Sequence, residues 1–261
     1  MNRPSRRSSA GSFNTLSTLE HDVVGLALQE ALGGRVVVIR PLGQGGMGQV
    51  YLGRDPQLKR FVAIKVLGRT LGQDAEAHAR FQREAQAIAA VSHPNVVDIY
   101  SIGELPDGTP YFVMQHVAGG SMAERIATSG PLPVEAAERV LGEVAAALAA
   151  AHRRGIIHRD VKPGNVLWDE YGERATVSDF GIASIQQREG EDADVRITAT
   201  GMTVGSPAYM SPEQLMNEPI TPKSDVYGLG LLGYELITGR GPYGANTPSE
   251  LVAAHLRDEP R

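Results

Sequence analysis

The hydrophobic pattern of this chain changes from mostly strand-like to mostly helical at Gly119 and Gly120. Before these glycines, short apolar runs are separated by glycine-rich or polar turns, as in a small sheet. After them, residues 134–152 place apolar side chains along one face of a long helix. Strands gathered in one part and helices in the other predict an α+β fold of two units. The predicted strands are residues 35–42, 49–55, 60–67, 96–102 and 111–117.

The N-terminal segment has its own character. Residues 1–16 are rich in Arg and Ser and are expected to form a disordered tail; an organelle transit peptide is the less favoured alternative. Ser17 and Glu20 then have the spacing of a capping box, an apolar stripe follows, and Gly33 ends it. We therefore expect residues 1–34 to be a disordered tail followed by a short amphipathic helix.

Composition excludes several classes of protein. The 261 residues carry 25 Lys and Arg against 30 Asp and Glu, a net charge of −5, which argues against nucleic-acid binding. The absence of cysteine excludes disulfides, thiol catalysis and cysteine zinc sites. No apolar run reaches the roughly 18 residues of a membrane-spanning helix. We expect a cytoplasmic chain with no membrane span of its own.

A glycine-rich turn follows the first predicted strand. Residues 43–50 read Gly-Gln-Gly-Gly-Met-Gly-Gln-Val, and glycines let a backbone approach a phosphate closely. Alone this pattern is weak, because a tight hairpin explains it equally well. A dinucleotide-binding fold needs a helix after the glycines, whereas a strand follows here. The turn therefore favours a glycine hairpin lying over phosphates.

Charged residues later in the chain suit phosphate chemistry. Lys65 lies on a predicted strand, and Glu84 on the predicted helix 74–90 is a possible partner, although a lone strand lysine is usually a solvated edge charge. Residues 158–165 offer a carboxylate to orient a hydroxyl, a cation and an amide oxygen, and Asp179 offers a second carboxylate for Mg²⁺. Each segment alone is explained as well by a polar loop.

In their order and spacing, these segments resemble the signature set of protein kinases. The glycine turn, Val-Ala-Ile-Lys at 62–65, His-Arg-Asp at 158–160, Asp-Phe-Gly at 179–181 and Ser-Pro-Glu at 211–213 occur in sequence. The amino-acid sequence in and around these motifs is similar to that of bacterial, eukaryotic-like serine/threonine kinases. The resemblance implies a bilobal fold, with residues 35–117 as a small antiparallel β-sheet lobe carrying one long helix. Residues 118–261 would form a mainly helical second lobe.

The resemblance also implies roles residue by residue. Glycines would cover the phosphates of ATP, three apolar side chains would sandwich the adenine, and Lys65, paired with Glu84, would contact the α- and β-phosphates. Asp160 resembles the catalytic base, and Lys162 resembles the contact to the γ-phosphate in its serine/threonine form. The implied ATP-binding residues are Leu42, Gly43, Gly45, Gly48, Val50, Ala63, Lys65, Met114, Gln115, Val117 and Leu167. The implied catalytic residues are Asp160, Lys162, Lys65 and Glu84, and the implied Mg²⁺ ligands are Asn165 and Asp179.

Further expectations concern regulation and partners. Thr198 and Thr200 match the activating phosphothreonines of related kinases, with Arg159 as the partner of the phosphate. The implied substrates are proteins with Ser or Thr hydroxyls, and a homodimer would serve trans-autophosphorylation. The apolar column at Ile88, Ile99, His158 and Phe180, anchored by Asp225, is equally well explained as ordinary core.

One departure from the family pattern and two rival functions accompany this interpretation. Family members continue through two more helices, one with an arginine that pairs with the glutamate matching Glu213, so the second lobe is expected to lack its last helices. A pseudokinase that binds ATP and signals by contact is the main alternative function. A small-molecule phosphotransferase shares a similar catalytic loop, but the long segment 182–213 favours a protein substrate.

Overall fold

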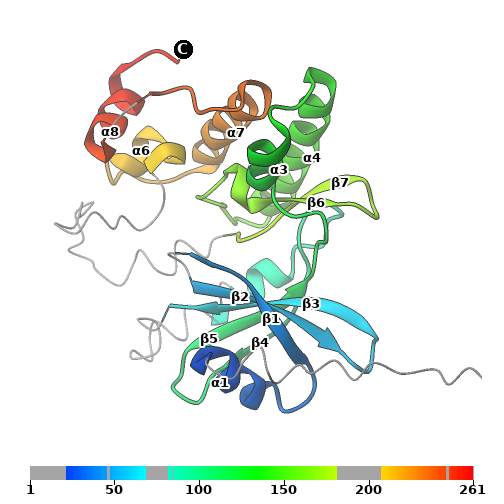
Figure 1. Ribbon diagram of the computed structural model, residues 1–261. Helices are drawn as coiled ribbons and strands as arrows, with labels where there is room; N and C mark the ends of the chain where they lie inside the picture. Colours follow the sequence, from blue (N-terminus) through cyan, green and yellow to red (C-terminus); the bar gives the residue numbers. More distant parts are fainter. Residues whose placement is uncertain are drawn as a thin grey trace, which may run out of the picture.

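The computed structural model describes residues 22–45, 48–68, 82–83, 85–180, 207–244 and 247–260. Figure 1 shows a β-sheet lobe and a helical lobe joined by the chain that leaves strand β5 (Pro110–Gln115). This is the predicted α+β, two-lobed arrangement, with the change in character at Gly119 and Gly120. Among the described helices, none is both long and apolar enough to cross a membrane.

The N-terminal lobe is built on a five-stranded antiparallel sheet in the order β1-β2-β3-β5-β4. Alternation along the strands gives the sheet two faces. Ile64 of β3 points to the outer face and Lys65 to the inner face, where Ala85 and Ile88 of the helical segment 85–89 also pack. The strands are β1 (Val37–Gly45), β2 (Gly48–Asp55), β3 (Arg60–Leu67), β4 (Ile99–Glu104) and β5 (Pro110–Gln115).

The outer face of the sheet is covered by helix α1 (Val23–Leu32). The Asp22 side chain caps its first turn by accepting from the N–H of Gly25 at 2.9 Å. The helix ends at Gly33, whose φ of 56° requires the left-handed conformation that glycine adopts freely. The predicted stop is therefore confirmed, and the described N-cap is Asp22; the predicted capping box at Ser17 and Glu20 lies outside the described residues.

One strand prediction was wrong at its start. Residues 96–102 were expected to form one strand, but β4 begins at Ile99, and Val96 makes an isolated bridge to Val177 instead. The Asn95 side chain explains the difference, because its amide donates to the carbonyl of Ala175 at 2.7 Å and ties this segment to the second lobe. Strand β5 ends at Gln115, two residues before the predicted limit.

The second lobe is mainly helical around one apolar core. Helices α4 and α7 pack closely, since a side chain added at Gly233 would meet Leu141 at 3.0 Å. The short hairpin β6–β7 is tied to Gly119 and Gly120 through the Trp168 backbone, and the Arg139 guanidinium lies over the Trp168 ring. The elements are α3 (Met122–Ser129), α4 (Val134–His152), η3 (Pro163–Asn165), β6 (Val166–Asp169), β7 (Arg174–Val177), η4 (Pro207–Tyr209), α6 (Pro212–Leu215), α7 (Pro222–Thr238) and α8 (Pro248–Arg257).

Candidate active site

The loop after α4 is held by one buried carboxylate. Asp225, on α7 and 1% exposed, accepts the backbone N–H groups of His158 and Arg159, each at 2.8 Å. It also lies 2.7 Å from Nε2 of His152. Arg159 has a φ of 69°, a conformation that costs about 1–3 kcal/mol outside glycine. Hydrogen bonds to a charged acceptor offset that cost and fix the direction of the next residue, Asp160.

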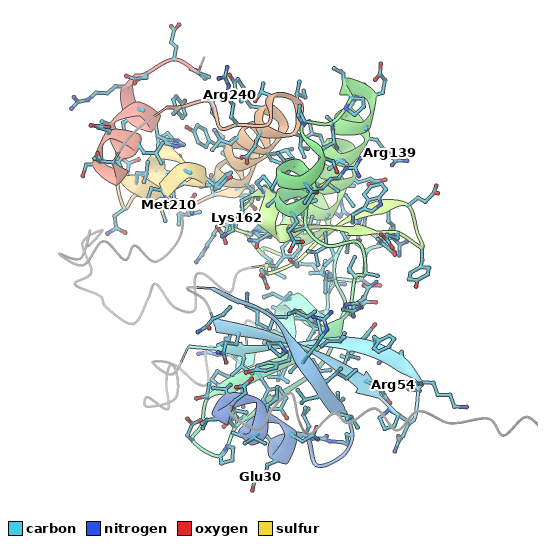
Figure 2. The ribbon with its side chains drawn as sticks, in the orientation of Figure 1. Glu30, Arg54, Arg139, Lys162, Met210 and Arg240 are labelled. Atoms are coloured by element: carbon cyan, nitrogen blue, oxygen red, sulfur yellow. The ribbon has the colours of Figure 1, made fainter. Side chains whose placement is uncertain are left out.

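Asp160 is the acidic centre of this loop. Its carboxylate Oδ2 lies 2.7 Å from Nζ of Lys162 and accepts from Nδ2 of Asn165 at 2.9 Å. Nδ2 of Asn165 also donates to the Asp160 carbonyl at 2.8 Å, so backbone and side chain are fixed together. Only 7% of Asp160 is exposed, although Lys162 beside it lies at the edge of the helical lobe that faces the sheet (Figure 2). A carboxylate held in this way is preorganised to receive a proton from a hydroxyl.

A second aspartate meets the sheet lobe across the cleft. Oδ2 of Asp179 lies 2.8 Å from Nζ of Lys65, which is 4% exposed on the inner face of β3. Asp179 has a φ of 64°, and the hydrogen bonds of its neighbour Ser178 with Asn165 and His158 hold it there. The other oxygen of Asp179, Oδ1, is buried without a hydrogen-bond partner in the described part of the chain.

These groups suit Mg²⁺. Oδ1 of Asp179 is an unpartnered carboxylate oxygen, and Asn165 uses its amide nitrogen for both bonds to Asp160, which leaves its amide oxygen for a cation. Among the described residues no three His, Cys, Asp or Glu side chains form a metal-binding cluster. Magnesium does not need one, because it is often held by one or two carboxylates together with phosphate oxygens. Asn165 and Asp179 therefore fit as Mg²⁺ ligands.

The glycine-rich turn joins β1 to β2, and β2 pairs with β3, the strand that carries Lys65. Gly48 has a φ of 130°, and a side chain there would collide with the Val66 carbonyl oxygen, so only glycine fits. Gly43 has open space around it, and Gly45 pairs with Gly48 across the hairpin. Leu42 is 40% exposed, beside a register shift in β1.

The residues predicted to hold the adenine come from both lobes. Val50 pairs with Lys65 across β2 and β3, and Ala63 pairs with Met114 across β3 and β5. The N–H of Gln115 donates to the Asp98 carbonyl at 2.9 Å, so its contribution to a ligand would come from its own carbonyl. Val117 and Leu167 follow, Val117 buried after β5 and Leu167 half-buried on β6.

Residues 209–214, which lead into α6 and form most of it, are anchored to the loop after α4 and to α7. Nε2 of Gln214 donates to the Arg159 carbonyl at 2.7 Å, and the Tyr209 hydroxyl donates to Glu235 at 2.7 Å. The carboxylate of Glu213, expected to need an arginine, accepts from the Ser224 hydroxyl instead. Burial raises the pKa of Glu213. Hydrogen bonds from Ser224 and from its own backbone N–H lower this pKa by more than burial raises it, so the net shift is downward.

The residues of the expected apolar column lie in or against the core of the second lobe. The rings of His158 and Phe180 lie 4.6 Å apart, Ile88 belongs to the same buried cluster as Phe180, and Ile99 packs against that cluster. The structure thus links Lys65, Asp160, Lys162, Asn165 and Asp179 in one cluster, through two ion pairs and the hydrogen bonds of Asn165 with Asp160 and Ser178. Glu84, Thr198 and Thr200 lie outside the described residues. Sequence reasoning missed His152, Asn95 and Ser178, whose bonds to distant segments leave no local pattern.

This arrangement of lobes and cleft defines a known class of protein. Residues 36–260 match the family described as "Protein kinase domain", and the chain belongs to that family. It is 39% identical over 234 residues to "Serine/threonine-protein kinase PrkC" of Bacillus subtilis, covering 90% of this chain and 35% of that protein. It is 42% identical over 231 residues to "Serine/threonine-protein kinase pkn2" of Myxococcus xanthus, covering 88% of this chain and 27% of that protein.

A solved structure agrees with the fold. The kinase domain of PknI from Mycobacterium tuberculosis superposes with a TM-score of 0.64 at 28% identity, covering 87% of this chain and 90% of that one. The chain spans about a third of the length of the curated relatives it matches.

Proposed function

We propose that this chain is a protein serine/threonine kinase that transfers the γ-phosphate of Mg-ATP to Ser or Thr hydroxyls of proteins. The observation that carries this proposal is a pair of linked carboxylates, each bound to a lysine. Asp160 is bound to Lys162 at 2.7 Å, and Asp179 is bound to Lys65 at 2.8 Å. We assign one acid to the hydroxyl and the other to the cation, each with a lysine for phosphate oxygens.

Each group has a distinct task in the proposed reaction. Asp160 orients the attacking hydroxyl and accepts its proton, while Lys162 offsets negative charge on the transferred group. Lys65 holds phosphate oxygens on the other side. Bound Mg²⁺, with Asn165 and Asp179 as ligands, supplies charge neutralisation. Phosphoryl transfer depends mainly on positioning and electrostatic stabilisation, which the fixed loops provide before substrate arrives.

The preference for Ser and Thr rests on Lys162 and on the relatives. Lys162 stands two residues after Asp160, the form found in serine/threonine kinases, and the matched relatives carry that name. The segment around Gln214 supports a protein substrate over a small molecule, because its hydrogen bond to the Arg159 carbonyl anchors it beside Asp160. We also propose that the chain acts in the cytoplasm, where ATP is available.

The main rival is a pseudokinase that binds ATP without transferring phosphate. A small-molecule phosphotransferase is the other rival. Transfer of labelled γ-phosphate to a generic protein substrate, with and without Mg²⁺, separates the protein kinase from both rivals. We expect transfer to protein serine and threonine that needs Mg²⁺ and disappears with Asp160→Asn. Nucleotide binding without transfer would leave the pseudokinase, and transfer only to small hydroxyl compounds would leave the phosphotransferase.

We further propose that phosphorylation of Thr198 and Thr200, in trans within a transient homodimer, regulates the enzyme. A phosphate adds about −1.5 to −2 charges and would attract the Arg159 guanidinium next to Asp160. The test is to incubate the chain with Mg-ATP, map phosphosites by mass spectrometry, and assay the Thr198→Ala/Thr200→Ala double variant. Full activity of that variant, or no phosphate at either threonine, would remove this regulation. A rate per enzyme that rises with enzyme concentration is expected for the reaction in trans.

A further inference from the structure

Helix α1 lies outside the residues that match the protein kinase family, yet it is packed into the N-terminal lobe. The match begins at residue 36, whereas α1 occupies Val23–Leu32. Leu28 and Leu32 are buried against the outer face of the sheet, in one cluster with Tyr51 and Ile64. Figure 1 shows α1 on the side of the sheet that is away from the helical lobe. The helix is therefore part of the lobe's core without being part of the family's pattern.

A polar side chain fixes α1 to the start of β1. Nε2 of Gln29 donates to the Val36 carbonyl at 3.2 Å, and Oε1 of Gln29 accepts from the Val38 N–H at 2.8 Å. The Gln29 amide thus forms hydrogen bonds with one backbone carbonyl and one backbone N–H at the edge of the sheet. Strand β1 is held from the helix side before it runs toward the glycine-rich turn.

A second contact ties α1 to β2. The Tyr51 ring is fully buried, and its hydroxyl donates to Oδ1 of Asp22 at 3.0 Å, the same oxygen that caps α1. Burial, and then the neighbouring Asp22 carboxylate, raise the pKa of Tyr51, so the hydroxyl stays protonated and continues to donate. Oε1 of Gln49 also lies 2.8 Å from the same hydroxyl, as a second acceptor. Since one hydroxyl carries one proton, a Gln49 amide turned to donate its N–H satisfies both contacts.

This chain of contacts ends inside the glycine-rich turn. Gln49 lies between Gly48 and Val50 and pairs with Gln44 of β1 across the hairpin. We propose that Asp22 and Tyr51 are positioning residues that hold the β2 side of this turn and so strengthen nucleotide binding. The proposal rests on the proposed function for the identity of the nucleotide. Helix α1 is then a working part of the nucleotide site, placed on the opposite face of the sheet.

Three single variants and one double variant of the full chain test this role. Tyr51→Phe removes the hydroxyl and keeps the buried ring. Asp22→Ser keeps a side chain that caps helices well but is too short to reach Tyr51. Glu30→Gln is the matched control, since Glu30 projects from α1 away from the sheet (Figure 2). The double variant Asp22→Ser/Tyr51→Phe shows whether the two residues act through one bond.

The measurements are the ADP dissociation constant, KM for ATP, kcat, and amide hydrogen exchange at residues 43–50 and in α4. For Tyr51→Phe and Asp22→Ser we expect ADP affinity to fall and KM to rise about threefold to tenfold, the effect of one hydrogen bond, with kcat unchanged. Exchange should quicken at residues 43–50 and stay the same in α4. The double variant should bind ADP as tightly as the single variant with the lower affinity, because both changes remove the same bond. Glu30→Gln should bind ADP like the wild type.

Other results overturn the proposal. Unchanged affinity and exchange at residues 43–50 would show that the contact does not reach the turn. Lower kcat and a lower melting temperature with unchanged affinity would assign Tyr51 a structural role alone. If the wild type transferred no phosphate, the proposed function would fail by itself. The exchange measurement needs neither activity nor nucleotide, so it would still decide the role of Asp22 and Tyr51.

Discussion

Nζ of Lys65 lies 2.8 Å from Oδ2 of Asp179, and this pair joins β3 of the N-terminal lobe to the segment after β7 of the second lobe. Both groups lie at the cleft, and Lys65 is almost completely buried. A buried charge needs its partner, because an uncompensated one costs several kcal/mol in effective desolvation. The pair therefore ties the two lobes together as long as both charges are present.

Replacing Lys65 with methionine should abolish most activity. Lys65→Met keeps most of the apolar side chain and removes the charge that pairs with Asp179 and that we propose contacts phosphate oxygens. We expect a loss of about two orders of magnitude in kcat, typical for removal of one stabilising group from a transition state. Lys59→Met, on the exposed turn before β3, is the control and should keep wild-type activity. Wild-type turnover in Lys65→Met would exclude Lys65 from the reaction.

Replacing Asp160 with asparagine should separate binding from chemistry. Asp160→Asn keeps the shape of the side chain but cannot accept the proton of the attacking hydroxyl. We expect kcat to fall by at least about two orders of magnitude, the usual contribution of a general base, while ADP affinity is kept. Asp258→Asn, after the exposed end of α8, is the control. The assignment of the base would be wrong if Asp160→Asn transferred phosphate at the wild-type rate.

Replacing each of two glycines of the glycine-rich turn with alanine should change stability by different amounts. Gly48→Ala places a side chain against the Val66 carbonyl at a φ of 130°, whereas Gly43→Ala enters open space at an ordinary φ. We expect Gly48→Ala to lower the free energy of unfolding by about 1–3 kcal/mol and to raise KM for ATP. Gly43→Ala should be nearly neutral in urea unfolding. Equal stability of the two variants would contradict the close approach at Gly48.

Stability should depend on Glu213 in a pH-dependent way. The folded-state pKa of this carboxyl lies below its ordinary value of 4.5, despite the opposing effect of burial, because Ser224 and the backbone stabilise the ionised form. Its contribution is therefore full above pH 4.5 and is lost as the pH falls through the folded-state pKa.

Melting temperatures from pH 7 to pH 3 test this dependence. Glu213→Gln should melt about 2–4 °C below the wild type at pH 7, as for a loss of about 1 kcal/mol, and the difference should shrink below pH 4.5. Glu218→Gln, an exposed neighbour, should follow the wild type at every pH. A gap between Glu213→Gln and the wild type that stays constant with pH would refute the assignment.

The sequence predicted those parts of the fold and site that depend on contiguous segments. The catalytic loop, the glycine turn and the end of α1 at Gly33 each have a local pattern that physical chemistry explains. Contacts between distant segments have no such pattern. Asn95 binds the Ala175 carbonyl across 80 positions of the chain, and that bond moves the start of β4 to Ile99. The docking of α1 on the sheet could not be predicted for the same reason, because an apolar stripe on a helix does not determine which surface the helix will pack against.

Helix α1 also changes where the folding unit begins. A chain cut at residue 36, where the family match starts, would leave the outer face of the sheet uncovered, including Val38, Tyr51 and Ile64. Strand β1 lies at the edge of the sheet, and the backbone groups that Gln29 occupies would be free to pair with another molecule. A contiguous apolar face beside an open strand edge promotes aggregation. The eleven residues from Asp22 to Leu32 thus protect the lobe from self-association.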